Sequence, residues 1–146
     1  MDSKHLVHQI AYSRKSLFDQ GYLDEQFIQL EDLQDDANPN FVEEIVSSFY
    51  SDSVRLLQNI ENTLGNKPVD FGKLDNYMHQ FKGSCSSIGA KKVSRECSQF
   101  REYCYAMNTQ GCITSMKQLK QEHATLRRKL QTYFELIRQA GESETC

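Results

Sequence analysis

Apolar residues recur at steps of three and four along four long stretches of this chain, and this spacing is the feature that most limits its fold. Such steps gather apolar side chains on one face of an α-helix, whereas in a half-buried β-strand apolar and polar residues alternate. Nothing alternates at period two over a useful length, and two prolines and seven glycines leave few breaks in 146 residues. The pattern predicts long helices over about 39–64, 70–88, 90–108 and 113–139.

Residues typical of helix ends lie at the ends of these predicted helices. The Asn38–Pro39 pair predicts a cap with proline at the first helical position. Asp70 is expected to cap the following helix, and Gly89 is expected to end it. Gly111 is expected to end the loop before the last helix. Because the turns between these helices are short, neighbouring helices should run up and down in a bundle.

Two shorter segments, about 4–20 and 24–33, carry apolar residues of the same kind ahead of the bundle. We therefore predict an all-α protein, an up-down four-helix bundle with two additional N-terminal helices that cover one end or side. The predicted organisation is a single domain over 1–146, with N-terminal helices in 1–36, the bundle in 38–140 and a frayed tail in 141–146.

Composition argues against several classes of function. The formal net charge is −3 and no basic stripe is interleaved with aromatic residues, which argues against nucleic-acid binding. No run approaches the length of about 18 apolar residues that a membrane span needs. The polar start, with Asp2, Lys4 and His5, lacks the pattern of a signal peptide. We expect no nucleic-acid partner and no membrane partner.

Five cysteines, an odd number without a Cys-x-x-Cys pair, favour reduced thiols inside a cell. They are Cys85, Cys97, Cys104, Cys112 and Cys146. Cys97 and Cys104 suit core positions on a predicted helix, and a thiol-based enzyme built on either one stays open as an alternative. His123 could join them at a metal, but no second histidine lies three or four residues away, so a structural zinc site is not expected.

One histidine falls on the polar side of a predicted helix. The apolar stripe of the 70–88 segment consists of Phe71, Leu74, Met78, Phe81, Cys85 and Ile88. At about 100° per residue, His79 lies roughly 130° from the centre of that stripe and so points outward. Asn76 precedes it on the same side, and Lys82, Gly83 and Ser86 follow. An exposed imidazole in this setting suits a phosphoryl acceptor better than a metal ligand.

The residues beside His79 have the properties that phosphoryl transfer needs. Imidazole has an unperturbed pKa near 6.5, so much of it is an unprotonated nucleophile at neutral pH. Lys82 can place an ammonium over the ring, and such transfer asks mainly for position and positive charge. Gly83 leaves the next place on that face empty, although a glycine within a helix costs roughly 1 kcal/mol relative to alanine. The alternative is an ordinary solvated histidine. By contrast, His123 lies in the apolar stripe of the last helix, where a hydrogen-bonded core or boundary position is expected.

The segment from His79 to Ala90 reads His-Gln-Phe-Lys-Gly-Ser-Cys-Ser-Ser-Ile-Gly-Ala. It resembles the motif of plant histidine-containing phosphotransfer proteins, His-Gln-x-Lys-Gly-Ser-Ser-x-Ser-Ile-Gly-Ala, and departs from it clearly only at Cys85, where serine is usual. Further segments also look like that family: Pro39–Glu44, Val69–Phe71, Phe100–Arg101 and Gly111–Cys112. The resemblance covers nearly the whole chain.

The resemblance implies an intermediate in a multistep His-Asp phosphorelay, which in plants carries cytokinin and related signals. Such a protein takes a phosphoryl group from the receiver-domain aspartate of a hybrid sensor kinase and passes it to the aspartate of a response regulator. By that match His79 is the acceptor, Lys82 steadies the phosphoryl group and Gly83 leaves room. The Mg²⁺ for transfer would lie in the partner receiver, since this chain has no carboxylate cluster to hold one and is expected to bind no cofactor. The resemblance thus implies a phosphorylated carrier, rather than an enzyme, that moves between cytoplasm and nucleus.

A receiver domain is expected to dock around His79, on a surface that includes Asn76, Ser86 and apolar residues of the second helix. That helix has apolar residues on more than one side, although its own anchorage needs only one apolar face. Ile28 is the first choice for an exposed contact, with Phe27 beside it. The interface should be small, with micromolar affinity, and the protein a monomer. A helical adaptor of the same fold but without phosphotransfer is the alternative function.

Overall fold

The computed structural model describes the backbone of residues 3–145 and the side chains of residues 4–141. This part of the chain forms six helices: α1 (Ser3–Asp19), α2 (Glu25–Leu33), α3 (Phe41–Leu64), α4 (Phe71–Ile88), α5 (Lys91–Tyr105) and α6 (Thr109–Thr145). The described residues contain no β-strand beyond two isolated bridges, so the predicted all-α class is confirmed.

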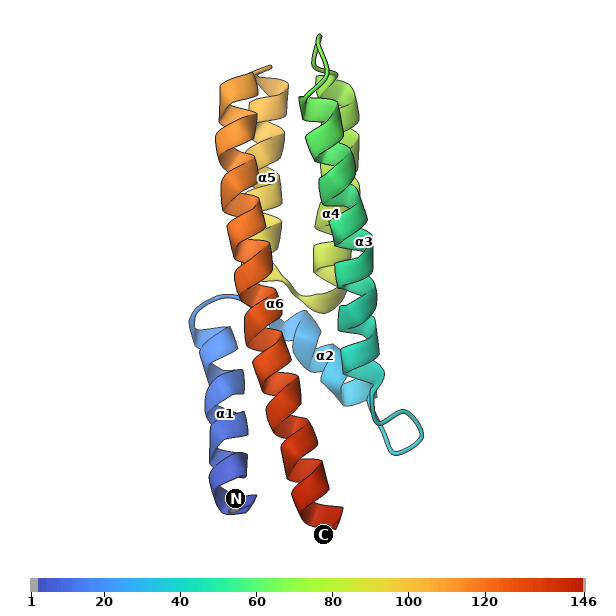
Figure 1. Ribbon diagram of the computed structural model, residues 1–146, viewed down its shortest axis with the longest axis vertical. Helices are drawn as coiled ribbons and strands as arrows, with labels where there is room; N and C mark the ends of the chain where they lie inside the picture. The colour runs from blue at the N-terminus through green and yellow to red at the C-terminus, as the bar shows by residue number, and fades with distance from the viewer. Residues whose placement is uncertain (1–2, 146) are drawn as a thin grey trace.

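The four long helices α3 to α6 stand side by side as an up-down bundle, each antiparallel to the next (Figure 1). The last helix, α6, continues past the bundle, and α1 lies along this extension (Figure 1). Within the described residues α1 packs along α6 and touches α2 through side chains, while α2 also contacts α3 and α4 at the end of the bundle. Although α6 has 37 residues, neither it nor any other helix in the described range is long and apolar enough to span a bilayer.

A polar network fixes the two N-terminal helices against α6. The carboxylate of Glu31 on α2 accepts a hydrogen bond from the Arg14 guanidinium of α1 at 2.7 Å and another from the Tyr133 hydroxyl of α6 at 3.0 Å. The rings of Phe18 and Phe27 pack beside this network with their centroids 6.2 Å apart. Partial burial reduces solvent screening of the ion pair, so it holds α1 more firmly than an exposed pair would.

The apolar stripe predicted for the 70–88 segment faces the core. Five of its residues are fully buried: Leu74, Met78, Phe81, Cys85 and Ile88. Only Phe71, in the first turn of α4, is half-buried. Burying a large apolar side chain stabilises a fold by about 1.5–3 kcal/mol, so these residues fix the rotation of α4 about its own axis. That rotation decides which side chains of α4 remain in solvent.

The start of α3 differs from the prediction. The helix begins at Phe41 after Asn40, so Asn38 is not its cap and the proline does not occupy the first helical position. The backbone N–H of Asn38 instead donates to the Asp35 side chain at 3.0 Å in the preceding turn. The first turn of α3 is capped from a distance, because the Gln34 side chain accepts from the Val42 N–H at 3.0 Å. A cap supplied eight residues earlier in the chain leaves no local sequence pattern.

The turn between α5 and α6 is also shorter than predicted. The helix α6 begins at Thr109, so Gly111 lies within its first turn and does not end a loop. The Asn108 side chain accepts from the Gly111 N–H at 2.9 Å and thereby caps the helix. A Cβ on Gly111 would lie 2.2 Å from the Tyr103 ring. The glycine is therefore needed for close approach of α5 and α6.

At the other end α6 runs further than expected. Its backbone is helical to Thr145, where a frayed tail is predicted for 141–146, and Cys146 lies outside the described residues. No proline follows Gln139, and a single exposed glycine lowers helix stability by only about 1 kcal/mol. Gly141 therefore does not end the helix.

The turn between α4 and α5 is joined to the loop between α1 and α2. Gly89 ends α4 in the left-handed conformation with φ 73°, as its predicted role requires. Its carbonyl accepts from the Asp24 N–H at 3.0 Å, and the Lys91 N–H donates to the Tyr22 carbonyl at 3.0 Å. A Cβ on Gly89 would lie 2.4 Å from the Asp24 carboxylate, so this contact has no room for another residue.

Candidate functional site

The helix α4 presents His79 to solvent. Asp70 caps the helix as predicted, since its side chain accepts from the Lys73 N–H at 3.0 Å. Met78 and Phe81, the apolar neighbours nearest to His79 in the sequence, are fully buried, and this turns the imidazole outward. His79 itself is exposed, in agreement with the helical-wheel prediction.

Neither the His79 imidazole nor the Lys82 ammonium makes a hydrogen bond or ion pair to any other residue in the described part of the chain. The backbone of Lys82 does take part in one, because its carbonyl accepts from the Ser86 hydroxyl at 3.2 Å. An imidazole and an ammonium that lack partners within the chain are both available to a molecule that approaches from outside. No rearrangement of internal bonds has to precede that approach.

Negative charge near His79 is neutralised. Asp75 lies one helical turn before His79, where a free carboxylate would repel a phosphoryl group. Its side chain instead accepts from the Arg101 guanidinium of α5 at 2.9 Å. This pair was not predicted, and only the packing of α5 on α4 brings it together. It leaves Lys82 as the unpaired charge beside the histidine among the described residues.

No packing contact within the chain requires a glycine at position 83. A Cβ built at this position meets nothing within 4 Å. At Gly111 and Gly89, by contrast, a Cβ would collide with neighbouring atoms. Since alanine would fit at Gly83 and favour the helix by about 1 kcal/mol, an internal contact does not explain the glycine. The space over Gly83 is open to a group from outside the chain.

The predicted docking residues fall into two groups. Asn76 and Ser86 are exposed on α4 with His79, and Ile28 on α2 is 37% exposed, so these three can contact a partner. Phe27 is 0% exposed, and its prediction as a docking residue is wrong. The ring packs inward against Phe18, because α2 uses this face to anchor itself on the bundle.

The exposed apolar residue that the prediction missed on α2 is Leu33, which is 65% exposed. It occupies the last position of the helix, beyond the turn that Leu30 anchors. Its place next to the polar segment 34–37 is the sequence signal that could have identified it. Ile28 and Leu33 are thus the exposed large apolar residues of α2.

The other candidate histidine has a structural role. His123 is buried, its Nε2 lies 2.7 Å from the Ser53 hydroxyl, and its carbonyl accepts from the Tyr50 hydroxyl at 3.3 Å. Burial, together with the nearby charge of Arg127, lowers the pKa of His123 to about 4. The predicted hydrogen-bonded core position is confirmed. Within the described residues no group of three or more metal-ligating side chains is present.

The two cysteines considered for a thiol-based enzyme, Cys97 and Cys104, are buried. Four of the five cysteines, Cys85, Cys97, Cys104 and Cys112, are buried and free, and Cys146 lies outside the described residues. Burial raises the pKa of the Cys97 thiol, and it raises that of Cys104 to about 12. Since the thiolate is the nucleophile, these thiols are nearly unreactive at neutral pH. This argues against the thiol-enzyme alternative.

The fold and the exposed histidine define a helical phosphotransfer module. The sequence model of the Hpt domain matches residues 44–129. The chain is 54% identical to pseudo histidine-containing phosphotransfer protein 5 of Oryza sativa subsp. japonica, over 100% of this chain and 96% of that protein. It is 60% identical to histidine-containing phosphotransfer protein 4 of Arabidopsis thaliana, over 80% of this chain and 91% of that protein.

A solved structure agrees with these sequences. The crystal structure of a histidine-containing phosphotransfer protein from Medicago truncatula superposes with a TM-score of 0.91 at 40% identity, covering 95% of each chain. The chain therefore belongs to the family of plant histidine-containing phosphotransfer proteins, the intermediates of two-component phosphorelays. Proteins of this family interact with the receiver domains of kinases and response regulators.

Proposed function

We propose that this chain carries a phosphoryl group on His79 between two receiver domains. The observation that carries the proposal is the outward imidazole of His79, which has no internal partner and lies beside Lys82 and the open space over Gly83. An unprotonated ring nitrogen attacks the phosphorus of an aspartyl phosphate, the N–P bond forms as the O–P bond breaks, and the aspartate leaves as a carboxylate. The reverse step, to the aspartate of a second receiver, completes the relay.

Lys82 stabilises the charge on the equatorial oxygens during both steps, because its ammonium has no carboxylate partner among the described residues. The remaining positive charge would come from a Mg²⁺ ion in the acidic pocket of the receiver. The described residues of this chain hold no cluster of carboxylates that suits a metal. We therefore propose a carrier that shares its chemistry with the partner and binds no cofactor of its own, rather than an enzyme.

The receiver is proposed to dock over His79, Asn76 and Ser86 on α4 and over the outward side of α2 at Ile28. These residues are exposed on helices that contact each other. A relay contact must also release its partner, so the interface should be small and its affinity micromolar. The proposal extends to a monomer that serves cytokinin signalling and moves between cytoplasm and nucleus.

An adaptor without phosphotransfer is the second candidate function. It is favoured by the similarity to a rice protein whose name carries the word pseudo. The exposed His79 favours the carrier, since an adaptor has no need of a nucleophile at this position.

Incubation with a phosphorylated receiver and Mg²⁺ separates the two functions. A carrier acquires a label that is lost in acid and survives in base, as a phosphoramidate does. An adaptor binds the receiver and acquires no label. A label that survives acid would place the phosphoryl group on another residue and contradict the proposal.

A further inference from the structure

The groove between α1 and α6 is a candidate binding surface that the relay does not use. It has a volume of about 530 Å³ and lies between side chains of α1 and of the extended part of α6. All of its lining residues belong to these two helices, and no other helix lines it. We propose that it docks an acidic segment of a protein partner other than the receiver domain.

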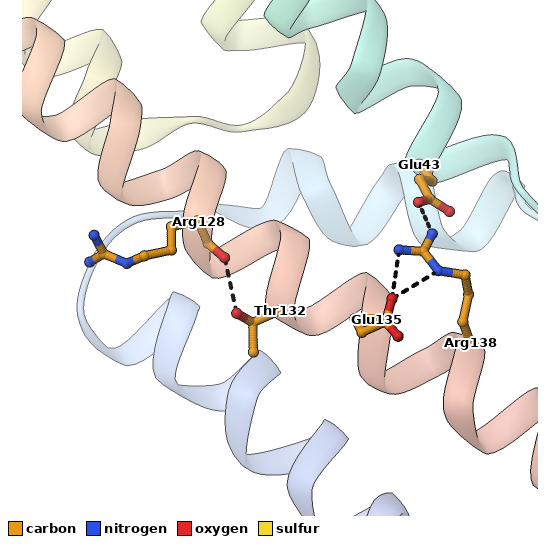
Figure 2. A network of polar contacts seen from close by, with 5 residues as sticks. All are labelled: Glu43, Arg128, Thr132, Glu135 and Arg138. Atoms are coloured by element: carbon orange, nitrogen blue, oxygen red, sulfur yellow. Dashed lines mark hydrogen bonds and ion pairs between the residues drawn. The ribbon is translucent and has the colours of Figure 1, made fainter.

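The charged side chains that line this groove are all basic. Arg128 and Lys129 of α6 and His8 of α1 line it, and no carboxylate does, although the chain as a whole has a net charge of −3. Neither Arg128 nor Lys129 forms an ion pair with any described residue. Figure 2 shows the Arg128 side chain extending on the α1 side of α6, away from the network around Arg138. Unpaired cations in a concave site raise the local concentration of anionic partners.

A second groove, between α3 and α6, serves as an internal comparison. It is larger, about 670 Å³, but its Arg138 already binds the carboxylates of Glu43 and Glu135 (Figure 2). Its other cation, Arg127, packs over the Tyr50 ring at 5.1 Å. The chain therefore supplies carboxylates to one of the two arginines there, whereas neither Arg128 nor Lys129 of the α1–α6 groove has a carboxylate partner in the described residues.

Lys129, which lines the groove, shares the Tyr22 ring with a second lysine. Lys129 lies 5.4 Å and Lys92 4.0 Å from the centre of this ring. The ring attracts both ammonium groups. Neither lysine forms an ion pair within the described residues, so the end of the groove at Lys129 is suited to an anion.

The groove also offers an apolar anchor. Tyr12 on α1 is 76% exposed and lines the groove together with the half-buried Leu136 of α6. Exposed tyrosines next to cations are typical of protein interfaces, since the ring gives contact area at a small entropic cost. The occupant is therefore a segment with at least two carboxylates and one apolar or aromatic side chain. A purely polyanionic ligand would leave Tyr12 and Leu136 unused.

This surface is separate from the phosphotransfer site. His79 lies on the outer face of α4, which does not pack against α1 in the described residues, whereas α4 meets α6 on its inner face, through buried rings such as Phe81. A partner in the groove can therefore remain bound while a receiver docks at His79. Such a partner would hold the carrier near a kinase or a regulator without blocking transfer.

A display library of random short peptides, selected on the full chain, tests the proposal. The enriched peptides should be acidic and carry an apolar or aromatic residue. Their affinity should fall about tenfold or more in an Arg128→Glu/Lys129→Glu variant, and it should weaken as salt is raised. Tyr12→Ala should weaken binding by several-fold, and all variants should still accept a phosphoryl group at His79. Circular dichroism checks folding, and the single changes Arg128→Gln and Lys129→Gln replace the double variant if it unfolds.

Arg55→Glu is the matched control, because Arg55 is an exposed arginine on α3 that does not line the groove. It makes the same type of charge reversal elsewhere and should leave peptide binding unchanged. Enriched peptides without excess acid, or equal binding by wild type and the charge-reversed groove, would overturn the proposal. So would tighter binding of anionic vesicles or duplex DNA through the same two cations.

Discussion

His79 and His123 have the same side chain in opposite environments, separated by one helix. His79 lies on the outer face of α4, exposed and without an internal partner. On the inner face of α4 the Phe81 ring packs against the His123 ring, with centroids 6.0 Å apart. There His123 is bound to Ser53 and its pKa is lowered to about 4. The difference teaches that burial and pairing, rather than residue type, separate a group that can react with a partner from one that stabilises the fold.

The sharpest test of this comparison is His79→Gln. Glutamine keeps a polar side chain on the solvent face but has no nucleophilic nitrogen, so acid-labile labelling by a phosphorylated receiver should disappear. The thermal midpoint should change little, because an exposed residue without partners contributes little to stability. Residual acid-labile label on the variant would mean that another residue accepts the group.

Lowering the pH should destabilise the folded protein through the second histidine, His123. The pKa of His123 is about 4 in the folded protein, against 6.5 when the ring is exposed. Between these values the unfolded chain binds more protons, so stability falls as pH falls from about 6.5 to about 4. Because each pKa unit is worth about 1.4 kcal/mol, the loss should be about 3 kcal/mol in total.

Urea midpoints measured across this pH range test the effect. The His123→Gln variant should lose this part of the pH dependence while His79 still accepts a phosphoryl group. If the urea midpoint changed with pH equally in the variant and the wild type, groups other than His123 would be responsible for the acid sensitivity.

Gly83→Val should slow phosphoryl transfer by roughly a hundredfold, because a branched side chain in the open space beside His79 displaces the receiver from its reactive position. Stability should change by less than about 1 kcal/mol, since a Cβ at this position meets nothing within 4 Å. Gly141→Val is the matched control, because Gly141 is equally open but lies near the end of α6. Transfer at the wild-type rate by the Gly83 variant would refute the clearance argument.

Lys82→Ala should have a smaller effect, about tenfold on the transfer rate. The change removes a charged partner of the phosphoryl oxygens and keeps the nucleophile. Lys73→Ala, on the same helix but more than one turn before His79, should leave the rate nearly unchanged. Rapid-quench labelling measures both, and equal rates for the two variants would exclude a specific role for Lys82.

The smallest effect on function is expected from a substitution on α2. Ile28→Ala should weaken receiver binding by a few-fold, because Ile28 is only 37% exposed and has little area to lose. Phe27→Ala should instead destabilise the protein by about 3–5 kcal/mol, because it empties a fully buried site. Calorimetry of receiver binding and chemical denaturation measure the two effects. Unchanged receiver binding in a folded Ile28→Ala protein would confine the docking surface to the four-helix bundle.

The sequence predicted the helices of this molecule well because their spacing of apolar residues is a local signal. The outward direction of His79 followed from that same spacing. The start of α3 could not be found in this way, since its cap comes from Gln34 across a turn. The start of α6 did have a local signal in Asn108, but the glycine three residues later was interpreted as the end of a loop.

Features that depend on packing between helices could not be predicted. The Arg101–Asp75 pair that removes negative charge near His79 joins α5 to α4. The inward direction of Phe27 depends on where α2 meets the bundle. The α1–α6 groove brings Tyr12 beside Arg128 and Lys129, which lie near the opposite end of the sequence. Its basic and aromatic residues are therefore not interleaved along the chain.

The contact at Gly89 also affects which segments of the chain unfold together. The backbone bonds from Asp24 to Gly89 and from Lys91 to Tyr22 join residues on both sides of the boundary at residue 44, where the Hpt match begins. Amide hydrogens that share such bonds become accessible to exchange only when both segments separate. In hydrogen exchange, the amides of Asp24 and Lys91 should therefore open together, so the cooperative unit that supports His79 is larger than the family's domain.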